Sequence, residues 1–392
     1  MKEFKYIIVG GGMTADAAVG GIRELDRDGT IAVLSDETHP PYSRPPLSKK
    51  LWAGKPLDSI WRKNAPGNSQ LFLDTRAVAG DVIAKTITDN RGEVYHYDKL
   101  LLATGGSPRR LPNAPQDIIY FRTLDDYQNL RKLADRKLEF IVIGGGFIGS
   151  EIAAALASNG CKVTIVFPDK GIGARIYPQA LSAFLNDYFR EKGIKVLAGE
   201  SVHAVDKQGG RYSVITESKK TLSGDAVVAG IGIEPNVDLA RSLGLQVDNG
   251  IVVDDALSAA PPDIFAAGDV ANFYNSVLGK RRRVEHEDNA NTMGAMAGRN
   301  MAGASEKYEY LPYFYSDLFD LGYEAVGEFG ANMDIVEDWQ ETFHKGVIYY
   351  LKDTHVRGVL LWNTWGQVNA ARELIVAKDS FNASDLRGRI HD

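Results

Sequence analysis

Short apolar runs alternate with glycine turns and helix-length segments through the first half of the chain. Residues 5–34 predict the order strand, glycine turn, helix and strand, with strands at 5–9 and 30–34 and a helix at 14–25. The same order recurs in residues 140–167. A short apolar run beside a helical segment is typical of a buried strand in a parallel sheet. Two copies of this βαβ unit predict two nucleotide-binding domains of the Rossmann type.

The second copy has expected strands at 140–143 and 162–167 around a helix at 149–159. A β-rich tract separates the copies, with strands expected at 78–88 and 93–97 and a following apolar run at 99–104. A matching strand and glycine element, residues 226–232, should close the second domain. Residues 305–392 are rich in aromatic residues and alternate apolar with polar positions, which predicts an antiparallel C-terminal α+β domain.

Composition excludes several classes of protein. The chain has 392 residues, 44% apolar and 24% charged, which is enough for two or three domains. A net charge of -6 argues against a general nucleic-acid binder, and the basic run 280–283 is either a solvated loop or a site for phosphate or an acidic partner. The single cysteine, Cys161, leaves no internal disulfide or dithiol pair. No apolar window reaches membrane-spanning length, and no secretory stretch precedes the first strand, so we expect a cytoplasmic protein.

Each glycine turn, residues 10–15 and 144–149, follows an apolar strand and opens a helix. Early glycines in such a turn allow a tight bend and bring backbone N–H groups close to a pyrophosphate at the helix N-terminus. Ala15 replaces the last glycine in the first copy. A lone pattern of this kind is weak evidence, but the repeated strand and helix context strengthens it.

An acid follows the next strand in both copies, Asp36 in the first and Asp169 in the second. A carboxylate at this place accepts hydrogen bonds from ribose hydroxyls and repels a 2′-phosphate, so Asp169 favours NADH over NADPH. The alternative is that Asp169 is a solvated acid in a loop and does not select the coenzyme. Lys170 and Arg175 lie nearby in the sequence and could tolerate the 2′-phosphate of NADPH.

Two further segments indicate a flavin. The first, residues 41–52, supplies Lys49 between the two glycine turns; the alternative is a surface lysine that caps a short helix. The second, residues 263–269, is a strand that ends in Gly268-Asp269, where small residues admit a cofactor and the acid can bind its sugar-like chain. Glu151 lies inside an apolar helix, where an unpaired carboxylate is expensive, so it should have a partner.

Together these residues make the chain resemble the two-dinucleotide flavoprotein reductases, and most closely their apoptosis-inducing factor branch. Bacterial ferredoxin and rubredoxin reductases share the same frame with looser agreement. The matching segments cover nearly the whole chain: residues 41–52, 143–151, 167–171, 232–237, 281–286, 315–318, 322–327 and 345–353.

The resemblance implies an α/β fold with two glutathione-reductase-type dinucleotide-binding domains and a C-terminal α+β domain that lies over the flavin. The expected domains are an FAD-binding domain (1–118 and 247–304), an NADH-binding domain (119–246) and the C-terminal domain (305–392). The residues expected at FAD are Gly10, Gly12, Met13, Thr14, Ala15, Asp36, Arg44, Lys49, Ala103, Thr104, Gly105, Arg122, Gly268, Asp269, Glu285, His286 and Tyr315. Those expected at NADH are Gly144, Gly146, Phe147, Ile148, Gly149, Glu151, Asp169, Arg175, Gly232 and Glu285.

By the same resemblance, Lys49, Glu151 and His286 are the catalytic residues, with Lys49 beside the flavin and paired with Glu151. A lone histidine is more often structural, and on the residues alone that interpretation of His286 is favoured. Tyr315 stands where the family commonly carries tryptophan, and Phe147 can gate the nicotinamide or simply pack.

The sequence therefore predicts an FAD-dependent NADH oxidoreductase whose acceptor is a ferredoxin-like or rubredoxin-like iron–sulfur protein or a diffusible molecule. The alternative is a redox-dependent binding module, similar to apoptosis-inducing factor, in which turnover is slow. A disulfide reductase is disfavoured because Cys161 stands alone. No metal site and no nucleic-acid partner are expected, and a homodimer is one of the assemblies left open.

Overall fold

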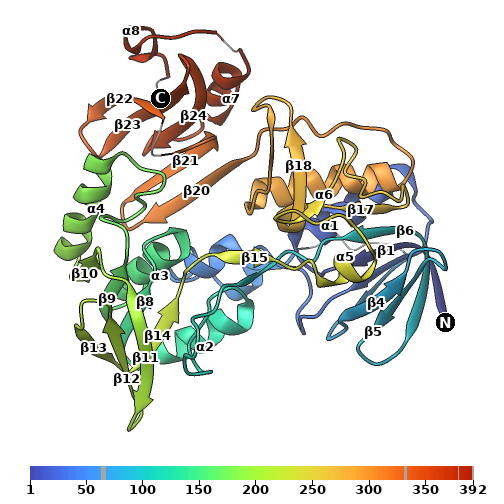
Figure 1. The fold of residues 1–392 in the computed structure, drawn as a ribbon, viewed down its shortest axis with the longest axis horizontal. Coiled ribbons are helices and arrows are strands. Elements are labelled where there is room, and N and C mark those ends of the chain that lie inside the picture. Colours follow the sequence, from blue (N-terminus) through green and yellow to red (C-terminus); the bar gives the residue numbers. More distant parts are fainter. Residues whose placement is uncertain (63–67, 331–332, 378, 391–392) are drawn as a thin grey trace. The chain divides into compact units, whose positions relative to one another are not determined.

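The computed structural model describes residues 1–62, 68–330, 333–377 and 379–390 (Figure 1). The chain forms two compact units, and each is assembled from three stretches of sequence. Unit 1 contains residues 1–44, 57–107 and 234–313; unit 2 contains residues 45–56, 108–233 and 314–392. The division into three domains stays a prediction.

Unit 1 is built on a seven-stranded sheet in which β1 (Lys2–Val9) lies between β2 (Ile31–Leu34) and β6 (Val94–Leu102), parallel to both. Val9 is in register with both Leu34 and Leu102, so three strands end at one edge. Helix α1 (Met13–Leu25) connects β1 to β2. The predicted first βαβ unit is therefore confirmed.

The expected strand at 78–88 is wrong. Two antiparallel strands, β4 (Ala77–Asp81) and β5 (Thr86–Asp89), replace it. The Asp81 carboxylate accepts the backbone N–H groups of Ile83 and Ala84, which stabilises a turn in the middle of the expected strand. The expected strand at 93–97 and the apolar run after it are instead one strand, β6.

Helix α6 (Glu287–Met301) packs closely on α1 through small residues. A Cβ atom added at Gly294 would lie 2.4 Å from the Thr14 carbonyl oxygen, and one added at Gly298 would lie 2.1 Å from the Ala18 carbonyl oxygen. Glycine at these positions therefore lets the two helix backbones approach. The remaining elements of unit 1 are η2 (Leu57–Ile60), β3 (Ser69–Phe72), α5 (Asp238–Ser242), β16 (Ile251–Val252), β17 (Ile264–Ala266), η3 (Gly268–Val270), β18 (Ala271–Asn275) and β19 (Lys280–Arg282).

Unit 2 repeats the βαβ arrangement in a four-stranded parallel sheet of order β10-β9-β8-β14. Strand β8 (Glu139–Ile143), helix α3 (Phe147–Ser158) and strand β9 (Lys162–Phe167) confirm the second predicted copy. Strand β14 (Ala226–Ala229) pairs with β8 as β6 pairs with β1. The other elements of unit 2 before its C-terminal stretch are η1 (Pro45–Ser48), α2 (Leu124–Asp135), α4 (Gln179–Glu191), β10 (Lys195–Ala198), β11 (Val202–Gln208), β12 (Arg211–Thr216) and β13 (Thr221–Gly224). The short strands β7 (Gly106–Pro108) and β15 (Ile233–Pro235) pair with each other where the chain passes from one unit to the other.

The C-terminal stretch of unit 2 forms a five-stranded sheet of order β20-β21-β24-β23-β22. The strand pairs β21–β24, β23–β24 and β22–β23 are antiparallel, as expected. Buried aromatic rings fill its core, where Tyr323 and Trp362 stack with centroids 5.7 Å apart. The elements are β20 (Tyr313–Leu318), β21 (Leu321–Gly327), β22 (Asp334–Glu341), β23 (Lys345–Lys352), β24 (His355–Trp362), α7 (Val368–Ala377) and α8 (Ala383–Leu386). Among the described residues, no helix is long and apolar enough to cross a membrane.

Candidate cofactor sites and a buried charge pair

The first glycine turn joins β1 to α1 and leaves no space for side chains at its base. Gly10 has φ +115°, and a Cβ atom there would lie 2.2 Å from the Ala103 carbonyl oxygen. At Gly12, the N-cap of α1, nothing lies within 4 Å of an added Cβ. The turn is therefore closed against the sheet and open in front of the helix N-terminus, where the dipole favours an anion. This shape fits the pyrophosphate of a dinucleotide.

The second turn, between β8 and α3, has nearly the same geometry. Gly144 has φ +116°, and its added Cβ would lie 2.3 Å from the Gly230 carbonyl oxygen. Gly146, the N-cap of α3, again has nothing within 4 Å, and at Gly149 an added Cβ would lie 1.9 Å from the Gly144 carbonyl oxygen. Each unit therefore has one cradle for one dinucleotide. The backbone of Gly230 was not predicted as part of this site, although it lies in the glycine element after β14.

The downstream Gly268-Asp269 motif lies beside the first cradle. Gly268 has φ +77°, and a Cβ there would lie 2.2 Å from the Thr14 hydroxyl oxygen. Its N–H group points to the sulfur of Met293 at 3.2 Å. Since Thr14 is in the first turn of α1, the fold brings together two predicted FAD segments that are separated by about 250 residues of sequence.

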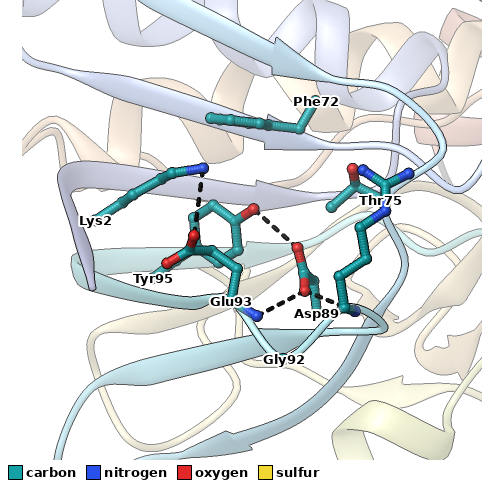
Figure 2. A pocket seen from close by; sticks show the side chains of 8 residues that line it. Lys2, Phe72, Thr75, Asp89, Gly92, Glu93 and Tyr95 are labelled. Atoms are coloured by element: carbon teal, nitrogen blue, oxygen red, sulfur yellow. Dashed lines mark hydrogen bonds and ion pairs between the residues drawn. The ribbon is translucent and has the colours of Figure 1, made fainter.

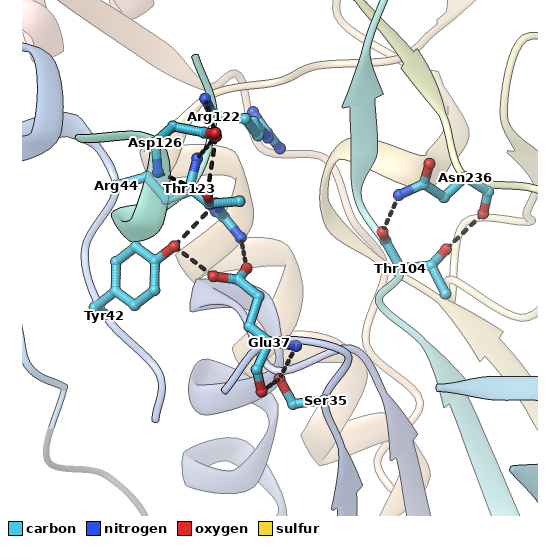
Figure 3. A network of polar contacts seen from close by, with 9 residues as sticks. All are labelled: Ser35, Glu37, Tyr42, Arg44, Thr104, Arg122, Thr123, Asp126 and Asn236. Atoms are coloured by element: carbon cyan, nitrogen blue, oxygen red, sulfur yellow. Dashed lines mark hydrogen bonds and ion pairs between the residues drawn. The ribbon is translucent and has the colours of Figure 1, made fainter. Parts of the chain in front are cut away.

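The acids after β2 have different partners. Asp36, the predicted ribose ligand, is exposed and pairs with Arg76 at 2.9 Å. The next residue, Glu37, accepts a hydrogen bond from the Tyr42 hydroxyl at 2.5 Å and forms an ion pair with Arg44 (Figure 3). Arg44, one of the residues expected at FAD, is thus held by a carboxylate. Glu37 was not predicted at this site, although the two adjacent acids after β2 were a signal for it.

Lys49 and Glu151 form a buried ion pair in unit 2. The Lys49 ammonium lies 2.7 Å from Glu151 Oε2, and their side chains are only 8% and 3% exposed. The interpretation of Lys49 as a surface cap is therefore wrong, and the expected partner of Glu151 is present. Glu151 lies in the second turn of α3, five residues after the N-cap Gly146, so one short helix segment carries both the second cradle and this carboxylate.

Strand β20 brings further groups to this pair. The Tyr315 ring centroid lies 5.3 Å from the Lys49 ammonium, a cation–π distance. Ser316 donates a hydrogen bond to Glu151. Burial raises the pKa of the half-buried Asp317; Lys49 opposes this effect and Glu151 reinforces it. The C-terminal sheet therefore contributes directly to the surroundings of Lys49, and tyrosine at position 315 is in contact range of it.

Other predicted FAD residues occupy loops and helix starts. Arg122 precedes α2, where its backbone N–H and the Thr123 side chain bond to Asp126 (Figure 3). The Thr104 hydroxyl donates to the Asn236 carbonyl oxygen at 2.7 Å, and Thr104 is followed by Gly105 at φ +64°. Arg122, Lys49 and Tyr315 belong to unit 2, whereas the remaining predicted FAD residues belong to unit 1.

On the NADH side, Asp169 follows β9, and its carboxylate lies 3.7 Å from the exposed Arg175 side chain. Phe147, the first residue of α3, meets Phe314 edge to face at 5.4 Å. Gly232 has φ +93° and accepts the backbone N–H of Arg109. Ile148 is exposed beside the cradle. These predicted NADH residues all belong to unit 2.

Glu285 and His286, by contrast, belong to unit 1. The Glu285 carboxylate forms an ion pair with Arg283 at 2.6 Å. His286 is the N-cap of α6.

The basic run is not a solvated loop. It includes strand β19, and the Arg281 guanidinium donates to the carbonyl oxygens of Val253 and Asn272 at 3.0 and 2.9 Å. Arg283 donates to the Asp269 carbonyl oxygen at 3.1 Å. Two of its four cations therefore stabilise unit 1 itself, which weakens the interpretation of this run as a docking site.

A separate hollow of about 350 Å³ lies in unit 1, lined by residues that include Lys2, Phe72, Asp89 and Tyr95 (Figure 2). Its charged groups already have partners in the protein: Lys2 faces Glu93 at 3.8 Å, Asp89 accepts the Tyr95 hydroxyl at 2.9 Å, and Arg91 pairs with Asp74 at 2.7 Å. This arrangement gives the hollow no candidate chemistry. Within the described part of the chain, no cluster of three or more His, Cys, Asp or Glu side chains is arranged to hold a metal ion.

Comparison with known proteins agrees with this geometry. Residues 4–294 match the family model of pyridine nucleotide-disulphide oxidoreductases, and residues 330–377 match the C-terminal model of mitochondrion-associated apoptosis-inducing factor. The chain is 35% identical to apoptosis-inducing factor 1 of Dictyostelium discoideum, over 96% of this chain and 79% of that protein. It is 33% identical to the ferredoxin–NAD(+) reductase component of the anthranilate 1,2-dioxygenase system of Burkholderia cepacia, over 96% and 95%.

A solved covalent complex of putidaredoxin reductase with putidaredoxin has a similar fold, with a TM-score of 0.91 and 29% identity over 98% of this chain and 96% of that one. These matches confirm the resemblance and the fold class inferred from sequence, and with them the expectation of FAD and NADH as cofactors. With Cys161 as the single cysteine, the redox disulfide in the family description has no counterpart here.

Proposed function

We propose that this chain, which belongs to the pyridine nucleotide-disulphide oxidoreductase family, takes hydride from NADH and passes electrons to a ferredoxin-like or rubredoxin-like protein or to a diffusible acceptor. The observation that carries the proposal is the buried Lys49–Glu151 pair, on the same helix segment as the second glycine cradle. Burying an ammonium costs free energy even when it is paired, and beside a redox ring such a charge would stabilise developing negative charge.

The two glycine cradles and the residues around them would have separate roles in binding FAD and NADH. The first cradle, with Gly268-Asp269 beside it, would hold FAD; the second cradle, with Asp169 for the ribose, would hold NADH. FAD when bound supplies the hydride acceptor and the exit for electrons. Lys49 would keep a positive charge fixed beside the ring, and Glu151 would hold that charge in position. Phe147 would cover the nicotinamide site, and His286 stays a proposed contact at the start of α6.

Anaerobic addition of NADH to the purified protein tests the first half of this proposal. We expect absorbance at roughly 450 nm, the usual flavin band, to fall. A stopped-flow panel should then mix the reduced protein with a ferredoxin, a rubredoxin, a quinone, a dye and oxygen. Reoxidation by one iron–sulfur protein much faster than by oxygen supports the carrier; no bleaching by NADH refutes the oxidoreductase.

The match of residues 330–377 to the C-terminal model of apoptosis-inducing factor supports a second candidate, a redox-dependent binding module. In that case reduction by NADH should change the oligomeric state, including formation or loss of a homodimer, and the reduced flavin should persist in air. Light scattering of oxidised and reduced protein distinguishes the two candidates.

The proposed cytoplasmic location is a separate matter. Relatives with mitochondrial and with bacterial names are both among the similar proteins. Fractionation of the source cells with an antibody to this chain tests it.

A further inference from the structure

Among the described residues, the Glu151 carboxylate has three donors, and they come from two separate segments of unit 2. Ser48, at the end of η1, donates to Oε2 at 2.6 Å, and Lys49 reaches the same oxygen at 2.7 Å. Ser316, on β20, donates to Oε1 at 2.6 Å. Ser48 and Ser316 are 6% and 1% exposed, so both hydroxyl groups are buried and bond to protein atoms rather than to solvent.

Two buried tyrosines, Tyr177 and Tyr323, lie close enough to this carboxylate for its charge to act on them. Burial raises the pKa of Tyr177 and of Tyr323, and the charge of Glu151 adds to the shift of both. The Tyr323 hydroxyl is buried without a hydrogen-bond partner among the described residues. A group in such surroundings cannot rely on solvent to fix its orientation, so the carboxylate depends on its protein donors.

We propose that Ser316 and Ser48 are positioning residues that fix the orientation of the Glu151 carboxylate and, through it, the place of the Lys49 ammonium. Neither serine was among the residues expected at a cofactor. Their effect on the redox ring rests on the proposed function, whereas their effect on Lys49 belongs to the protein alone and can be measured without FAD.

The two serines are not equivalent. Oε1 has Ser316 as its one donor in the described structure, so the Ser316→Ala substitution leaves that oxygen buried and unpaired. Oε2 keeps Lys49 when Ser48 is removed. Ser316→Ala leaves a buried charged oxygen with no donor, whereas Ser48→Ala removes one of two donors from the other oxygen. A buried charged atom without a hydrogen bond costs more free energy, so Ser316→Ala should have the larger effect.

The first experiment measures the acylation rate of Lys49 in the FAD-free protein with a water-soluble amine reagent and peptide mass spectrometry. Ser316→Ala should raise this rate about tenfold, Ser48→Ala should raise it less, and Ser316→Thr, which keeps the hydroxyl on a strand, should restore it. Thr364→Val is the matched control: Thr364 is fully buried in unit 2, and its hydroxyl bonds to the carbonyl oxygens of Gly346 and Trp362, at 3.3 and 3.2 Å, rather than to Glu151. Equal Lys49 rates in Ser316→Ala and Thr364→Val would overturn the proposal.

The second experiment uses the FAD-loaded protein and separates positioning from a general loss of structure. Ser316→Ala should lower the limiting rate of reduction by NADH about tenfold with an unchanged NADH dissociation constant. It should also lower the flavin midpoint potential by about 30 mV, which is a tenfold change for a two-electron couple. If the acylation rate of Lys49 rises but the flavin potential and the limiting rate of reduction stay unchanged, the proposed effect of Ser316 on the flavin is refuted. Its effect on the position of Lys49 then still stands. Failure of the wild-type protein to be reduced would refute the proposed function and leave the first experiment standing.

Discussion

Replacing Lys49 by methionine should destabilise unit 2 far more than removal of an ordinary surface lysine. The substitution keeps an unbranched apolar side chain of similar length and removes the ammonium from a pair that is 8% and 3% exposed. Breaking a buried pair costs about 3–5 kcal/mol, because an uncompensated charge remains. Ser48 and Ser316 still donate to Glu151, so we expect the lower end of this range, about 3 kcal/mol.

The assay is urea unfolding of the FAD-free protein, followed by far-ultraviolet circular dichroism, for Lys49→Met, Glu151→Gln and the double variant. The double variant has no buried charge, so it should be more stable than the sum of the single effects predicts, by about 2 kcal/mol. Arg190→Met is the control, since Arg190 pairs with Asp187 at 2.6 Å on the surface of α4. This exposed pair should contribute less than about 1 kcal/mol.

Two results would refute the reasoning. One is a loss below about 1 kcal/mol for Lys49→Met, which is the behaviour of an exposed pair. The other is simple additivity in the double variant, which would show that the two charges do not depend on each other. Neither result depends on any cofactor.

Three further predictions concern the cradle, the pH response and the coenzyme. Gly146→Ala should leave the melting temperature unchanged, because nothing lies within 4 Å of the added Cβ, and should weaken NADH binding, measured by calorimetry, at least tenfold. Gly144→Ala should weaken binding and also lower the melting temperature, because Gly144 has φ +116°. Loss of melting temperature in both variants would contradict this. Hydrogen bonds, first from Lys5 and then from the Gly29 backbone, lower the pKa of Asp26. Its contribution is therefore present above its ordinary value of about 3.8 and lost as pH falls, so Asp26→Asn should lower the melting temperature at pH 7 and progressively less towards pH 3. Asp169→Ser should reduce the ratio of NADH to NADPH rates at least fivefold; an unchanged ratio would show that this carboxylate does not contact the ribose.

The local pattern predicted the repeated part of the fold well. Both βαβ units carry continuous apolar strands and glycine turns, so the strand, turn and helix at residues 5–34 and 140–167 follow from neighbouring residues. The strand expected at 78–88 failed for a local reason, because the Asp81 side chain bonds the backbone ahead of it and starts a turn.

The site could be predicted only where each residue has a chemical reason of its own. The position of Glu151 within an apolar helix predicted that its carboxylate has a partner, and Lys49 is that partner. Ser316 carries no such signal, because a serine on a strand is ordinary and its contact with Glu151 spans 165 residues of sequence. Glu37 was overlooked for a different reason: both it and Asp36 fit the pattern, and only the backbone direction after β2 decides which one reaches Arg44.

The discontinuous make-up of unit 1 has a consequence for biosynthesis. Strand β17 pairs with β6 across more than 160 positions, and α6 packs on α1 across more than 260. The ribosome must therefore release roughly 300 residues before the N-terminal strands can be covered, which takes roughly 15–60 s at 5–20 residues per second. During that interval the apolar faces of β1 and α1 are exposed to the cell, so a nascent chain stalled before α6 should be a good client for chaperones.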